Sequence, residues 1–244
     1  MVNMFAPELF YWILVPAAVI GGFLRGFAGF GGPLFMLPIL SLFLPPAVAV
    51  GVMMWIDMFS NVHLIPNARA DSSRIVVVPL LVGTAVAMPV GAHVLLSVEP
   101  ALMKKIICGS ILLMALVLLT GWRFRNALGA PGYVGIGALS GFVMGATAIA
   151  ATTPLFLGAG HQTAAQNRAN FIVWVFPSTV LLIALLTWRG ALAAGDAVAI
   201  LVLTPIYLIS VVLGTRTHRI ASDATVRRTV LALVIVTATA GLVL

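Results

Sequence analysis

Charged residues are scarce in this sequence. Asp and Glu together number 6 of 244 residues, Lys and Arg number 13, and the four types make up 8% of the chain. Hydrophobic residues make up 62%, and the mean hydropathy is +1.18. A water-soluble domain of this length carries far more charge on its surface. The deficit therefore excludes a soluble fold and predicts an all-α integral membrane protein with many crossings.

Cysteine and histidine are also scarce. The single Cys108 lies in an apolar run, which excludes a disulfide framework and a cysteine metal site. The four histidines are scattered, and Asp57 is the only carboxylate deep within an apolar run. An enzyme needs a cluster of such groups, so we expect no catalytic residues, no metal and no cofactor.

The basic excess, a net charge of +7 with a pI near 10.8, has two interpretations. It could indicate nucleic acid, but in a membrane protein Lys and Arg gather in the cytoplasmic loops. We expect no nucleic-acid partner. The first residues, "MVNMFAPELFYW", lack the basic region of a signal peptide, so we expect this segment to be retained.

The number of crossings follows from the apolar runs, since a helix needs about 20 apolar residues to cross a bilayer. The runs cover 9–24, 26–68, 75–98, 106–122, 126–167, 169–188, 197–215 and 229–244. Two have double length and are expected to break near Pro45–Pro46 and near Gly158–Gly160. This gives ten segments, five in each half. Ten crossings place ten arginines on one face and three basic residues on the other, whereas eight crossings divide them eight to five. The positive-inside rule favours ten, with both termini outside.

An internal repeat agrees with this count. "GGFLRGFAGFGGPLFMLP" (21–38) resembles "GALSGFVMGATAIAATTP" (137–154), and Trp55 and Trp174 hold matching positions further on. We predict two repeats, 1–125 and 126–244. Five segments per repeat is an odd number, so the second repeat is inverted. Inverted repeats with broken or short helices at their interface are typical of secondary transporters.

Each repeat is expected to contain a broken helix. The glycine cluster 26–32 and "GATAIAATT" (145–153) are followed by prolines, and Pro33, Pro38 and Pro154 suit the first turn of a helix. We predict an unwound strip in each repeat, then a short helix whose N-terminus points into the protein and attracts an anion. The two ends are expected to converge on one cavity. The upstream glycines also match small-xxx-small packing motifs, and both roles are compatible.

At these residues the chain resembles the sulfite exporter TauE/SafE family of membrane permeases. The resemblance is carried by "GFLRGFAGFGGPLFMLP" and by its weaker second copy, which has "ATAIAATT" in place of the family's glycine triplet. It implies transport of small sulfur-containing anions across the inner membrane. Sulfite, sulfoacetate and related organosulfonates are the leading candidates.

A sulfonate spreads its charge over several oxygens, so several converging donors are expected to hold it. The predicted substrate-binding residues are Arg25, Gly29, Phe30, Gly31, Gly32, Asn61, Thr147, Thr152, Thr153, Arg168, Asn170 and Trp174. Arg168 equally fits an anchor at the membrane face, and Trp174 equally fits packing. Asp57 fits two roles, proton coupling or a salt bridge with Arg25.

The sequence thus predicts a secondary transporter that exports small anions, with the lipid bilayer and the anion as its partners. Association with further copies of itself is left open. One alternative is a membrane subunit of a multi-component transporter, although the chain has no nucleotide-binding motif. Another is a proton-coupled carrier of a different small organic anion.

Overall fold

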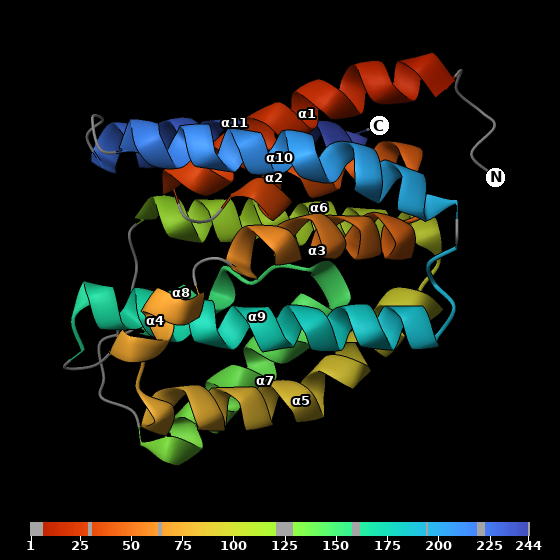
Figure 1. Cartoon of the computed structure of the whole chain (residues 1–244). Coiled ribbons are helices and arrows are strands. Elements are labelled where there is room, and N and C mark those ends of the chain that lie inside the picture. Colours follow the sequence, from red (N-terminus) through yellow and green to blue (C-terminus); the bar gives the residue numbers. More distant parts are fainter. Residues whose placement is uncertain are drawn as a thin grey trace.

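The computed structural model of the chain describes residues 7–28, 31–62, 65–120, 129–157, 162–193, 195–218 and 223–243, and all the regular secondary structure in them is helical. Figure 1 shows the helices lying side by side, roughly along one direction. They are α1 (Pro7–Ala28), α2 (Gly32–Phe43), α3 (Pro46–Val62), α4 (Ile65–Asp71), α5 (Arg74–Ser97), α6 (Pro100–Thr120), α7 (Ala130–Thr147), α8 (Thr152–Leu157), α9 (Ala164–Trp188), α10 (Asp196–His218) and α11 (Asp223–Val243).

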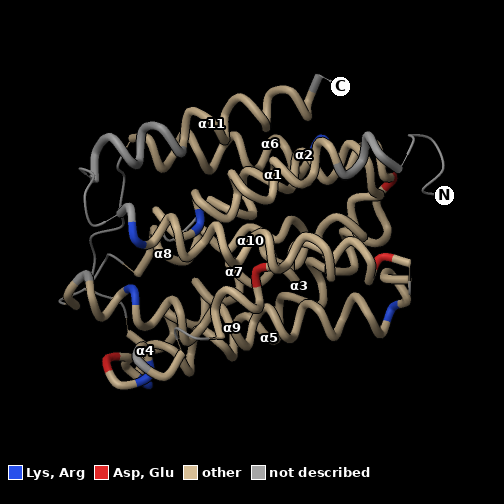
Figure 2. The backbone as a smooth tube through the Cα atoms, turned by 45° about the horizontal axis from the view of Figure 1, so that its top comes forward, with Lys and Arg blue, Asp and Glu red and all other residues tan. Residues whose placement is uncertain are grey.

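The helices have the length and composition of membrane spans. Four of them, α5, α6, α9 and α10, are long and apolar enough to cross a bilayer. The helices α1 and α11 have 22 and 21 residues, about 30 Å at 1.5 Å per residue. Figure 2 shows most charged residues near the helix ends. The prediction of an all-α, multi-pass membrane protein is confirmed.

The helices form two groups with α3 between them (Figure 1). In one group α1 packs along α10, and α2 and α6 pack against α11. In the other, α5 packs along α7 and α9, and α9 also contacts α4 and α8. The helix α3 contacts α2, α9 and α10, so its side chains face both groups.

Glycines bring α1 and α10 into close contact. A Cβ added at Gly22 would meet the backbone carbonyl of Tyr207, and one at Gly26 would meet that of Val211. On the opposite helix, a Cβ at Gly214 would meet the backbone of α1. The two backbones therefore touch along this seam, as small residues allow in membranes.

The seam between α5 and α7 is built in the same way. Cβ atoms added at Gly137, Gly141 and Gly145 of α7 would each meet the backbone of α5, and one at Gly83 of α5 would meet that of α7. The predicted packing role of these spaced glycines is confirmed.

We expect Gly137→Val to destabilise the protein strongly, because the valine would push against the backbone at Leu80, which cannot move aside as a side chain does. Gly135→Val in the same helix is the matched control, since an added Cβ there meets nothing within 4 Å. Thermal unfolding in detergent checks this. Equal melting temperatures for the two variants would contradict a packed seam at Gly137.

The helix breaks differ from the predicted ones in extent. The break at Pro45–Pro46 is present, between the end of α2 and the start of α3. The residues 158–160 lie outside the described part of the chain, and α9 runs unbroken through Arg168, where two apolar segments were expected. Pro38 lies in the middle of α2, not in its first turn. Charge on one exposed side chain does not end a helix, so the segment division at Arg168 was wrong.

The helices α6 and α11 run in opposite directions. In Figure 1 the colours advance one way along α6 and the other way along α11. The packing agrees, since Gly241 near the end of α11 lies against Cys108 in the first half of α6. The two helices are therefore antiparallel.

Candidate functional site

The break before α2 places a helix N-terminus inside the protein. Gly31 caps α2 with φ 108° and ψ −25°, a left-handed conformation that suits glycine, and Pro33 follows in the first turn. The amides of Gly32 and Leu34 have no partner within the helix, because its first turn has no preceding carbonyls. The chain then turns back along α1, since Met36 packs against Gly21.

A charged cluster lies beside this N-terminus. Nε of Arg25 donates to Oδ1 of Asp57 at 2.9 Å, and its Nη2 donates to Oδ1 of Asn61 at 2.7 Å. Asp57 also accepts from the Tyr207 hydroxyl at 3.2 Å, from the Ser60 hydroxyl at 3.2 Å and from Nδ2 of Asn61 at 3.1 Å. We call these five residues the Arg25 cluster. It contains the salt bridge that was one of the two predicted roles of Asp57.

The Arg25 cluster and the start of α2 are in direct contact. A Cβ added at Gly32 would meet the hydroxyl of Tyr207, and it would come within 3.0 Å of Cβ of Arg25. Asp57 and Asn61 are 4% and 1% exposed. Tyr207 stands at the midpoint of α10, a helix long enough to cross the bilayer. The first turn of α2 and the Arg25 cluster therefore meet deep within the protein.

The second break lies between α7 and α8. Ala148 ends α7 with φ 57°, a left-handed conformation that alanine adopts at a cost, and α8 begins at Thr152. Thr152 and Thr153 are buried, and among the described residues neither hydroxyl has a hydrogen-bond partner. Unpartnered buried hydroxyls are uncommon, so they mark this break as a place where a polar ligand could be held.

The second break is shorter than predicted. The strip was expected to cover 145–153, but α7 continues to Thr147 and only residues 148–151 lie between the helices. The hydroxyl of Thr147 donates to the carbonyl of Val143 at 2.7 Å, within α7 itself. In the first half α1 likewise continues to Ala28. Gly29 and Phe30 lie outside the described residues.

Asn170 and Trp174 lie on α9. Asn170 bonds to the residues just before α5 and just before α9, and Trp174 bonds to α5. The buried Asn170 accepts from the backbone N–H of Ser73 at 2.7 Å and donates to Gln162 at 2.7 Å. The indole of Trp174 donates to Thr84 at 2.9 Å, and the Thr84 hydroxyl donates to the carbonyl of Gly137 at 3.0 Å. These bonds join α9, α5 and α7.

Arg168 is exposed in the first turns of α9 and takes no part in the Arg25 cluster. Its place near a helix end fits the anchoring role, and contact with an anion at this position stays a prediction.

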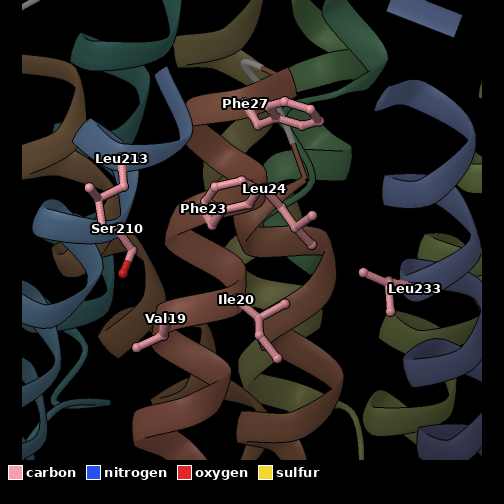
Figure 3. Close-up of a pocket in the computed structure, with 8 residues that line it drawn as sticks. All are labelled: Val19, Ile20, Phe23, Leu24, Phe27, Ser210, Leu213 and Leu233. Carbon is pink, nitrogen blue, oxygen red and sulfur yellow. The ribbon is translucent and has the colours of Figure 1, made fainter. Parts of the chain in front are cut away.

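One cavity of about 260 Å³ opens between α1, α10 and α11. Figure 3 shows its lining, which is aliphatic and aromatic apart from Ser210. It contains no predicted site residue and no charge, so it suits an acyl chain better than an anion. That the two breaks share one cavity stays a prediction.

Sequence reasoning missed Tyr207 and Ser60. Tyr207 is a single phenol in the middle of an otherwise apolar run, and that position was the available signal. Ser60 is one helical turn from Asp57, as Asn61 is, so the same helical-face argument would have included it.

The protein-family model described as "Sulfite exporter TauE/SafE" matches residues 14–240. The match extends from α1 to α11 and so includes both breaks and the whole Arg25 cluster. The resemblance found in the sequence is confirmed. No curated protein and no solved structure matches the chain.

Proposed function

This chain belongs to the TauE/SafE sulfite exporter family, a family of membrane transporters, and we propose that it exports sulfite, sulfoacetate or a related organosulfonate across the inner membrane. The observation that carries the proposal is the contact between the start of α2 and Arg25. Both favour negative charge, and both are largely buried.

The proposed site holds an anion by several weak donors. The amides of Gly32 and Leu34 supply two of them, and Arg25 supplies charge that Asp57 balances when the site is empty. A resting site without net charge costs less in the membrane than an isolated guanidinium would. Gly32 has no side chain, so the Tyr207 hydroxyl lies close to the backbone at the start of α2.

We further propose that the halves 1–125 and 126–244 are inverted repeats and that the break before α8 completes the site. The opposite directions of α6 and α11 and the glycine seams of both halves support this. In both seams, the first helix of one half packs along a later helix of the other half: α1 along α10, and α7 along α5.

Flux through liposomes that contain only the purified chain tests the proposed function. We expect sulfite or sulfoacetate to leave the vesicles faster than from protein-free vesicles, and Arg25→Leu to abolish the difference. If the pure, folded chain showed no flux, a subunit of a multi-component transporter would be favoured. If the chain transported an unrelated carboxylate and sulfite did not compete with it, the alternative of a carrier for a different small organic anion would be favoured.

Thr152→Val and Thr153→Val are each expected to weaken anion binding about two- to thirteenfold, for a loss of about 0.5–1.5 kcal/mol per hydrogen bond. Because neither hydroxyl has a partner among the described residues, the melting temperature of the empty protein should stay unchanged or rise. Calorimetric titration with sulfite and thermal unfolding check the two effects. Thr84→Val is the control, because it breaks the bonds to Trp174 and Gly137 and should lower stability instead. Unchanged affinity in both threonine variants would remove α8 from the site.

Export of a monovalent anion needs no coupling ion. A cell interior that is negative by 100 mV favours its exit by about 2.3 kcal/mol, roughly fiftyfold. We therefore expect Asp57→Asn to retain voltage-driven export that does not respond to an imposed pH gradient. Export by the parent protein should likewise not respond to an imposed pH gradient. A pH-driven flux in the parent that Asp57→Asn abolishes would establish proton coupling through Asp57.

A further inference from the structure

A second basic site lies at the start of α5, apart from the Arg25 cluster. A cavity of about 620 Å³ opens there between the α4–α5 junction and α9. Arg69, Ser72 and Arg74 line its polar part, and Val77, Val78 and Val173 line its apolar part. Its volume falls within the range of small-molecule sites.

The two arginines of this cavity have no acidic partner in the described part of the chain. Both are exposed, and no carboxylate of the described residues lies within ion-pair distance of either. Asp71 lies between them in sequence and is exposed, yet it forms no ion pair with them. The cavity therefore offers two guanidinium groups to an external anion.

An apolar track leads away from the cavity along α5. Val78, Val82, Val86 and Val90 are spaced by four residues, so they lie on one face of the helix. They are 54%, 53%, 72% and 56% exposed. The stripe is about 18 Å long at 1.5 Å per residue, comparable to an extended acyl chain. Two arginines that can bind a phosphate thus lie next to an apolar stripe about as long as an acyl chain.

We propose that this groove binds an anionic phospholipid, with the phosphate between Arg69 and Arg74 and one acyl chain along the valine stripe. Guanidinium groups bind phosphate oxygens with two donors each, which suits a headgroup at the membrane surface. A zwitterionic lipid carries no net charge, so it gains less from the two arginines than an anionic lipid does. With the ten crossings predicted from the sequence, the positive-inside rule puts these arginines at the cytoplasmic leaflet, which carries anionic lipid.

Thermal unfolding of the detergent-purified chain with added lipid tests the proposal. Phosphatidylglycerol is expected to raise the melting temperature of the parent in a saturable manner, and phosphatidylethanolamine is not. In Arg69→Gln/Arg74→Gln we expect roughly thirtyfold weaker binding of phosphatidylglycerol, about fivefold per basic side chain. Arg69→Lys/Arg74→Lys keeps the charge and should retain most of the effect.

The matched control is Lys104→Gln/Lys105→Gln, which removes two charges from α6 and should leave the response to phosphatidylglycerol unchanged. An unchanged response in the double arginine-to-glutamine variant would overturn the proposal, as would equal stabilisation by phosphatidylethanolamine. Equal stabilisation by glycerol 1-phosphate would show a soluble phosphate ligand in place of a lipid. None of these measurements depends on transport, so the outcome is independent of the proposed function.

Discussion

Gly32→Ala is expected to abolish the binding of sulfite and sulfoacetate. The new Cβ would occupy the place of the Tyr207 hydroxyl and would press on Arg25. It would therefore disturb the Arg25 cluster, and it would also fill the space in front of the α2 amides. We also expect lower stability, by about 1–3 kcal/mol for an overpacked position. Calorimetry and thermal unfolding of the purified variant measure the two effects.

A second substitution separates packing from binding at Gly32. Gly32→Ala/Tyr207→Phe removes the hydroxyl that the new methyl group meets, and it should recover much of the lost stability. Binding should remain lost, because the methyl group still covers the first turn of α2. Tyr207→Phe alone loses one hydrogen bond to Asp57 and serves as the control. If affinity returned with stability in the double variant, Gly32 would be a packing residue and the anion site would lie elsewhere.

Arg25→Leu is expected to end export and to lower the free energy of unfolding by about 3–5 kcal/mol. The variant leaves the buried Asp57 carboxylate without its counter-charge, and removing one partner of a buried pair has this effect. Arg25→Leu/Asp57→Leu replaces the whole pair with apolar side chains and should recover most of the stability. Chemical unfolding in detergent and liposome flux provide the readouts.

The double variant decides what the ion pair does. If Arg25 attracts the anion, Arg25→Leu/Asp57→Leu stays inactive although it is stable. Recovery of export in that variant would show that the pair only joins α1 to α3. Asp57→Asn, which keeps Arg25, should remain active in either case, and it controls for the loss of the carboxylate.

Local features of this fold could be predicted from the sequence, because they depend on residues close together in the chain. Glycine and proline predicted the break before α2 and the one at Pro45–Pro46, and the spacing of Asp57 and Asn61 placed both on one face of α3. Low charge predicted the membrane class. Each of these inferences needs only helix geometry and the cost of polar groups in lipid.

Features that join distant segments could not be predicted. Spaced glycines indicate that a helix has a close neighbour, but they do not say which helix, so the pairing of α1 with α10 was not found. Tyr207 reaches Asp57 across 150 residues of sequence for the same reason. The second break was placed too broadly, since Ala148 takes the left-handed conformation in which glycine is expected.

The pairing of helices sets an order for assembly during synthesis. The partner of α5 is α7, which begins 33 residues after α5 ends, whereas the partner of α1 is α10, roughly 170 residues further along. At about 5–20 residues per second, α1 waits on the order of 10–30 s in the bilayer with its glycine face uncovered. The α5–α7 pair can close long before that. The group of α4, α5, α7, α8 and α9 is therefore synthesised while the Arg25 cluster still lacks α10, and Tyr207 is the last of the five cluster residues to be made. A substitution that slows α1–α10 closure is therefore expected to lower the yield of protein even where the finished protein is stable.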